Sequence, residues 1–294
     1  MKREGVDMKA IDMHSHWSTK KGYLWRTHDE VKHADKRFRI KTFYRTEEEM
    51  AMDLRKADIK TVLDFGFTID VSSEELRELH DYAGQFMRGH PDVVLGWWVC
   101  LDPRTGLKGL RELERCLKDL GAIGFIANPT GLGIPPTDPV FYPFYEMCSE
   151  AKAMVTLCVG FTAAGAGYRG GQGLLLEHCH PRYVDEVAAK FPDLTIIAAR
   201  TAWPWEREMI AVTLHKTNVW FELHGWPPKY FAPELRWDIS RRLQDRVLFG
   251  ADYPLFDYSR LFSDWESEDY TSEILRKIYY ENAQSLLQSL CRNI

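Results

Sequence analysis

The histidines near the start of the chain are the residues best suited to chemistry. An apolar run that begins at Ile11 ends in His14 and His16, which are one residue apart. Side chains on a β-strand alternate with a period of two, so both imidazoles are expected on one face at the end of a strand. Such a pair supplies half of a metal site. The alternative is a pair of ordinary surface histidines, and the rest of the chain decides between them.

The composition limits the classes of protein. The chain has 294 residues, of which 45% are apolar, and it is rich in aromatic residues, which suits a large core and a pocket for an organic molecule. Its net charge is −5 and no run of Lys or Arg is long enough to follow a phosphate backbone, so we expect no nucleic-acid partner. No apolar stretch reaches about 18 residues, and the first residues do not resemble a signal peptide. We therefore expect a cytoplasmic protein with a small-molecule substrate and no membrane partner.

Strand and helix patterns alternate along the whole chain. Eight strand-like runs are expected, two of them starting at Ile11 and Thr61 and the others at 93–99, 122–127, 154–159, 194–199, 219–223 and 247–250. Helical patterns lie between them, at 46–57, 73–87, 106–119, 139–152, 181–190, 204–216, 232–242 and, after the last strand, 271–290. Eight such units favour an α/β fold, a single (β/α)8 TIM barrel, over an open doubly wound sheet. No linker or repeat divides the chain, so we expect one barrel domain over residues 1–294.

A barrel of this kind holds its active site at the carboxyl ends of its strands. Residues 17–45, after the first strand, show no sustained period, and we expect this long loop to cover the site. The glycine-rich segment 165–173 lacks the G-K-[ST] ending of a phosphate loop, so we interpret it as a second flexible cover.

Four motifs resemble the amidohydrolase superfamily. They are Ile-Asp-Met-His-Ser-His at 11–16, Phe-Pro-Asp-Leu at 191–194, Trp-Pro-Trp at 203–205 and Leu-Phe-Gly-Ala-Asp-Tyr-Pro at 248–254. The chain is most similar to the amidohydrolase-related branch, which includes aminocarboxymuconate semialdehyde and resorcylate-type decarboxylases. The resemblance implies one divalent metal, usually zinc, held by His14, His16, a histidine after strand five and Asp252. It also implies a second histidine, after strand six, that polarises the substrate, with metal-bound water as nucleophile and Asp252 as base.

The chain departs from this pattern at the ligands themselves. Cys158 stands where the strand-five histidine belongs, and Arg200 stands where the strand-six histidine belongs. A thiolate is a good zinc ligand, so Cys158 is a candidate metal ligand with His14, His16 and Asp252, although a buried cysteine is as often inert. A guanidinium cannot ligate a metal, and we expect Arg200 to pair with Asp252 instead. The departures therefore favour a metal-free site slightly over a zinc site.

The predicted catalytic residues are Asp252, His14, His16 and Arg200. The predicted substrate-binding residues lie at strand ends or in the loops behind them, and are Trp17, Asn128, His178, His180, Trp203, Glu222, His224, Trp226 and Tyr253. The aromatic residues among them have core packing as the alternative role, and His178 and His180 have the alternative of replacement metal ligands.

The first functional hypothesis is a hydrolase of a small aromatic or acyl carboxylate, with weakened or lost metal dependence. A decarboxylase or another C–C bond lyase acting on a similar substrate is the second hypothesis, because fold does not fix the reaction. A catalytically inactive binding protein is the third. Relatives in this branch are commonly dimers, so a homodimer is expected as an alternative to a monomer.

Overall fold

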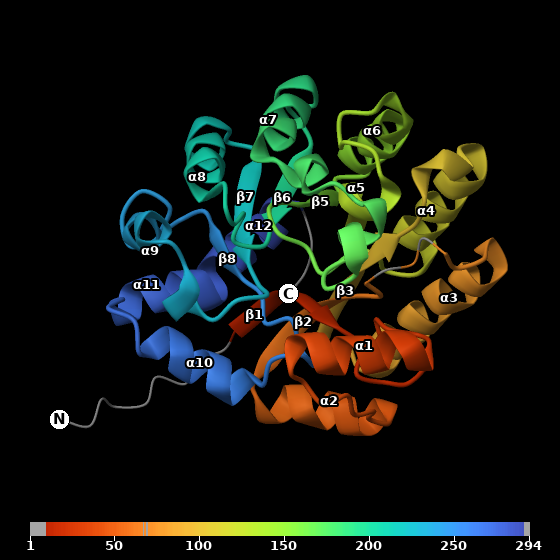
Figure 1. The fold of residues 1–294 in the computed structure, drawn as a ribbon, viewed down its shortest axis with the longest axis horizontal. Coiled ribbons are helices and arrows are strands. Elements are labelled where there is room, and N and C mark those ends of the chain that lie inside the picture. Colours follow the sequence, from red (N-terminus) through yellow and green to blue (C-terminus); the bar gives the residue numbers. More distant parts are fainter. Residues whose placement is uncertain (1–9, 67, 69, 291–294) are drawn as a thin grey trace.

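The computed structural model describes residues 10–66, 68 and 70–290 and shows a barrel of parallel strands surrounded by helices (Figure 1). The eight strands pair in sequence order, β1 to β8, each parallel to the next. They are β1 Ala10–His16, β2 Ile59–Asp64, β3 Val94–Cys100, β4 Gly124–Ala127, β5 Met154–Cys158, β6 Thr195–Ala199, β7 Val219–Leu223 and β8 Val247–Phe249. The predicted (β/α)8 TIM barrel is confirmed. The outer ends of the predicted domain, residues 1–9 and 291–294, lie outside the described residues.

Hydrogen bonds between β1 and the segment after β8 close the barrel. The Asp252 N–H donates to the His14 carbonyl at 2.9 Å, and the His16 N–H donates to the Tyr253 carbonyl at 2.6 Å. The first and last parts of the chain therefore meet directly at the end of the barrel where the histidine pair lies.

Most helices lie where the sequence pattern predicts them. They are α2 Glu47–Lys56, α3 Ser73–Gly89, α4 Leu107–Asp119, α6 Tyr142–Glu150, α7 Pro181–Lys190, α8 Glu206–His215, α9 Pro233–Ile239, α11 Ser272–Arg276 and α12 Asn282–Ser289. The structure adds α1 His28–Phe38, the short α5 Pro129–Leu132 and α10 Tyr258–Glu266. The described chain contains no helix both long and apolar enough to cross a bilayer.

The predicted loop at 17–45 is corrected by α1, which lies in its middle. A capping box begins this helix: Thr27 accepts from the Glu30 N–H, and the Glu30 side chain accepts from the Thr27 N–H. The spacing of these residues was a sequence signal for the helix, but the polar composition hid its apolar face.

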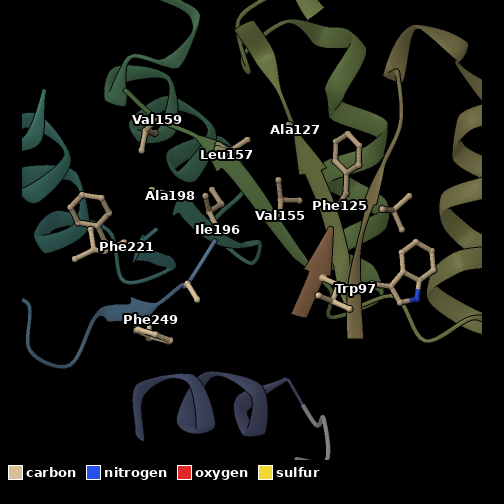
Figure 2. Packing of buried hydrophobic residues seen from close by; sticks show 14 of the residues in the cluster. Trp97, Phe125, Ala127, Val155, Leu157, Val159, Ile196, Ala198, Phe221 and Phe249 are labelled. Carbon is tan, nitrogen blue, oxygen red and sulfur yellow. The ribbon is translucent and has the colours of Figure 1, made fainter. Parts of the chain in front are cut away.

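Two apolar layers hold the barrel. The outer layer lies between the strands and the helices, and Figure 2 shows part of it, with Trp97, Phe125 and Phe221 among the labelled residues. The inner layer fills the barrel near the amino ends of its strands, where Leu286 and Leu287 of α12 pack with Ile11 and other strand residues. At the carboxyl ends of the strands, the side chains that point into the barrel are mostly polar.

A register shift in β1 aims the histidines. The pairing of β1 with β2 shifts between Asp12 and Ser15, which is a local irregularity of the kind that redirects side chains. The Asp12 carboxylate holds this bend: it accepts from the His14 N–H at 3.0 Å, the Ala251 N–H at 3.0 Å and the Tyr258 hydroxyl at 2.7 Å. Burial raises the pKa of Asp12 to about 6, against the hydrogen bonds that lower it.

Candidate active site

A cavity of about 440 Å³ opens at the carboxyl ends of the strands. Residues that end β1 to β6, or directly follow a strand, contribute to its polar floor, and they include His14, His16, Asp64, Cys158 and Asp252. The walls are mostly apolar, and their large side chains are Trp25, Phe38, Leu101, Phe161, Trp226, Tyr230 and Phe256.

The floor is organised around His16, which lies between two carboxylates. Its Nδ1 atom is 2.8 Å from Oδ1 of Asp64, and its Nε2 atom is 3.0 Å from Oδ1 of Asp252. Asp64 also reaches the other histidine, with its Oδ2 3.2 Å from His14 Nε2. The sequence analysis missed Asp64, although it ends an apolar strand and the strand-end rule could have found it.

Charge is unevenly shared among these groups. Burial disfavours the protonated form of His16, but Asp64 and the hydrogen bond to Asp252 outweigh it and raise the pKa of His16 to about 10. Burial lowers the pKa of His14 to about 4 despite the nearby Asp64. The pKa values of Asp64 and Asp252 both fall below the ordinary range, because the attraction of His16 outweighs their burial. Without a bound ion, the pair of carboxylates therefore holds a proton on His16 and leaves His14 neutral.

A second polar pair comes from β7. Glu222 Oε2 lies 2.5 Å from Nδ1 of His224, and both side chains are at most 1% exposed. The His224 ring stacks on the His14 ring, with centroids 3.5 Å apart and planes 4° apart. Burial lowers the pKa of His224 well below its usual value, and burial raises that of Glu222 well above its usual value. The sequence analysis predicted that both residues bind substrate; in the structure they lie behind His14, outside the cavity lining.

The donors present fit a divalent metal ion. Two groups of three residues bring their ligand atoms within 4.8 Å of one another: His14, His16 and Asp64, and His14, His224 and Asp252. Several buried atoms of these residues have no hydrogen-bond partner among the described residues, including Nδ1 of His14 and Nε2 of His224. Buried polar atoms are rarely left so, and imidazole with carboxylate suits Zn²⁺ or Mn²⁺. This donor set argues against the metal-free expectation.

The Cys158 thiol, predicted as a candidate metal ligand, lies apart from the clustered donor atoms. It lines the cavity, but it belongs to neither group of clustered donors. Burial raises the pKa of Cys158 to about 12, partly offset by Arg200, so the thiol stays protonated in the absence of an ion. A third donor cluster, His80, Glu112 and Cys116, lies between α3 and α4 and takes no part in this cavity.

Arg200 lines the cavity but does not pair with Asp252, which corrects the sequence expectation. The Asp252 carboxylate pairs with His16 Nε2 instead, and Arg200 forms no ion pair with any described residue. Gly225 leaves room for this guanidinium, because a Cβ atom there would lie 3.2 Å from Arg200 Nη1. Arg200 therefore has its charge available to a ligand in the cavity.

Further arginines line the cavity toward solvent and were missed by the sequence analysis. They are the exposed Arg37 and Arg39 at the end of α1 and Arg260 on α10. The glycine-rich segment meets α1 here: His33 Nε2 lies 3.0 Å from the Ala166 carbonyl, and the His33 ring stacks on Tyr168 at 3.7 Å. The two predicted covers thus contact each other.

Of the other predicted substrate-binding residues, some line the cavity and some do not. Asn128 and Trp226 line the cavity. Trp17 is fully buried in the core against Phe65, and Tyr253 donates to Ser18 at 3.1 Å behind the site.

The remaining three also lie outside the lining. His180 caps α7 by accepting from the Arg182 N–H, and His178 has its Nδ1 buried. Trp203 is 51% exposed and touches Trp226 on the rim.

A family model described as amidohydrolase matches residues 11–288. The chain belongs to the amidohydrolase family. The resemblance found in the sequence motifs is therefore confirmed. No curated protein matches the sequence.

Several solved structures share the fold of this family member. An uncharacterized TIM-barrel protein from Bordetella bronchiseptica has a TM-score of 0.72 at 20% identity, covering 97% of this chain and 100% of its own. A dihydroxybenzoic acid decarboxylase from Polaromonas, with manganese and 2-nitroresorcinol bound, has a TM-score of 0.67 at 17% identity, covering 96% and 97%. A 5-carboxyvanillate decarboxylase from Novosphingobium aromaticivorans, with manganese and a nitrobenzoic acid, has a TM-score of 0.65 at 14% identity, covering 96% of each chain.

Proposed function

We propose that this amidohydrolase-family protein is a metal-assisted decarboxylase of a small aromatic carboxylate. The observation that carries the proposal is the unpaired Arg200 guanidinium beside a buried imidazole and carboxylate floor, inside a cavity with apolar walls. An apolar cavity with few convergent polar groups is typical of a site for an organic molecule, and a free guanidinium selects an anion. The decarboxylase activities of two proteins with the same fold agree with this choice.

Arg200 and the walls bind and orient the substrate. The guanidinium offers two parallel N–H donors to a carboxylate or phenolate oxygen, and Trp226 and Phe161 contact the aromatic ring. The 440 Å³ cavity suits a single substituted ring rather than a polymer. A bound ion, held by donors among His14, His16, Asp64 and Asp252 of the floor and His224 behind it, would offset negative charge on substrate oxygens.

The pair of His16 and Asp252 holds the proton that the reaction needs. Its Nε2 and Oδ1 atoms are 3.0 Å apart, and both side chains line the cavity. Transfer of this proton to the ring carbon that bears the carboxylate permits the C–C bond to break, so that CO2 leaves and the electron pair returns to the ring.

Hydrolysis, the first hypothesis from the sequence, would use the same cavity residues but give a different product. The test is to incubate the protein, with Mn²⁺ or Zn²⁺, with hydroxybenzoates and carboxyvanillate-type acids and to measure CO2 and the phenol formed. Release of CO2 with one equivalent of phenol supports the proposal. Release of an acid from ester or lactone substrates, with no CO2 from any acid, overturns it in favour of hydrolysis. Tight binding with no turnover overturns it in favour of a binding protein.

A further inference from the structure

The metal site of this chain lacks one ligand that its family resemblance implies, the histidine after strand five, and also the substrate-polarising histidine after strand six. Cys158 and Arg200 occupy the places after β5 and β6 where histidines were expected. Neither residue belongs to a cluster of donor atoms in the described chain. An ion in the floor therefore needs another donor.

The β1 pair does not supply two free imidazoles. Both ring nitrogens of His16 face carboxylates, Asp64 at 2.8 Å and Asp252 at 3.0 Å. A nitrogen that donates a hydrogen bond to a carboxylate has no lone pair for a metal. His14 differs, because only its Nε2 faces a carboxylate, Asp64 at 3.2 Å, while its Nδ1 has no hydrogen-bond partner among the described residues.

His224 supplies the missing donor. Its Nδ1 is held by Glu222 at 2.5 Å, while its Nε2 is buried without a partner in the described chain. One donor atom each from His14, His224 and Asp252 lie within 4.8 Å of one another. A single ion with ligands at about 2.1 Å bridges such a group after small side-chain movements.

We propose that His224 of β7 is a metal ligand, with His14 and Asp252, and that it replaces the ligand histidine absent from β5. The ion is a divalent first-row cation such as Mn²⁺ or Zn²⁺, since the donors are two imidazoles and a carboxylate. The proposal concerns the ligands and holds whichever reaction the enzyme catalyses.

Glu222 is the positioning residue for this ligand. A carboxylate that accepts from Nδ1 of a histidine fixes the ring and leaves the lone pair of Nε2 for the ion. Gly250 leaves the space that this carboxylate occupies, because a Cβ atom at position 250 would clash with Glu222 Oε1. Any residue larger than glycine at position 250 would displace it.

The test is metal binding, measured without substrate. Wild type, His224→Phe, Glu222→Gln, Asp64→Asn and Cys158→Ala are stripped with chelator, then titrated separately with Mn²⁺, followed by electron paramagnetic resonance, and with Zn²⁺, followed by calorimetry and elemental analysis. The Phe variant keeps a flat ring against His14 but removes both nitrogens. Circular dichroism and the melting temperature establish that each variant is folded.

We expect about one ion per wild-type chain and at least a tenfold weaker affinity in His224→Phe. Glu222→Gln should weaken metal binding by about tenfold, the lower end of the usual effect of losing a carboxylate that orients a metal-bound histidine. If His224→Phe fails to fold, the Glu222→Gln variant by itself tests the proposal. Cys158→Ala should bind as wild type does, and Asp64→Asn should lose less affinity than His224→Phe. Unchanged affinity in His224→Phe, greater loss in Asp64→Asn, or no ion bound by wild type would each overturn the proposal.

Discussion

Asp64 Oδ1 lies 2.8 Å from Nδ1 of His16, and both side chains are at most 5% exposed. Asp252 holds the opposite nitrogen of the same ring at 3.0 Å. The imidazole is thus fixed between β2 and the segment after β8, and these three residues connect parts of the barrel that are far apart in sequence. The arrangement gives the floor its rigidity as well as its charge.

Asp64→Asn should therefore lower both stability and activity. The amide cannot balance a protonated His16, and loss of one partner of a buried charged pair is strongly destabilising; with Asp252 still present we expect a loss of roughly 2 kcal/mol. Urea unfolding measures this loss. Glu48→Gln is the matched control, because its ion pair with Arg55 is exposed and should be worth about 0 to 1 kcal/mol. Equal effects of the two substitutions would contradict the prediction.

The ion network on the outer face of the barrel gives a pH-dependent prediction. Burial would raise the pKa of Glu112, but hydrogen bonds from His80 and Arg115 outweigh it and lower the pKa from 4.5 to about 2. A depressed carboxyl pKa stabilises the fold fully above the unfolded value, and the stabilisation is lost as pH falls toward the folded value.

Glu112→Gln should therefore cost about 2 kcal/mol at pH 7, allowing for screening at a partly exposed site, and the difference from wild type should shrink between about pH 4.5 and 2. Chemical unfolding at a series of pH values measures this. A difference that stays constant down to pH 2 would show that the carboxylate charge is not responsible.

The sequence predicted most of what depends on local pattern. The strand runs, the barrel and the floor residues His14, His16 and Asp252 follow from periodicity and motifs, because each strand carries its own signal. Asp64 ends β2, so the strand-end rule could have marked it as a candidate, but its pairing with His16 of β1 joins residues distant in sequence and has no local signal. The polar stretch at 17–45 hid α1, whose apolar face is small, and only the capping spacing of Thr27 and Glu30 marked it.

Other predictions about the site were wrong because tertiary packing decides which of several residues of the same type reaches the cavity or a given partner. Trp17 directly follows the histidine pair, yet the course of the chain turns it into the core, whereas Trp226 reaches the cavity. The predicted pairing of Arg200 with Asp252 was chemically reasonable, but in the structure the Asp252 carboxylate pairs with His16. No local pattern in the sequence states which cation is nearer.

Arg200 should determine the affinity for anionic substrates. Its guanidinium has no ion-pair partner in the described chain, so Arg200→Gln removes a charge-assisted contact to the ligand and should weaken binding of 2,6-dihydroxybenzoate by about 10-fold to 100-fold. Arg200→Lys should recover only part of this, because an ammonium lacks the planar fork. Calorimetry or competition measures the affinity.

Arg260→Gln is the control, because that side chain is 63% exposed at the mouth and 3.7 Å from Asp264. It should change affinity by less than about threefold. If Arg260→Gln weakened binding more than Arg200→Gln, the anion would bind at the mouth and not near the floor.

The contact between the glycine-rich segment and α1 gives the last prediction. Gly167 has a φ of 83°, and a Cβ atom there would lie 2.6 Å from Cδ of Arg37, a cavity residue. Gly170 has a φ of 61° and no heavy atom within 4 Å of such a Cβ. Both Gly→Ala changes carry the same backbone cost of about 1 kcal/mol, but only Gly167→Ala must displace Arg37. We therefore expect similar melting temperatures for the two variants and a severalfold higher KM for Gly167→Ala alone, measured with the substrate found in the CO2 assay. An equal rise in KM in both variants would show that the backbone of the segment, and not its contact with α1, controls access to the cavity.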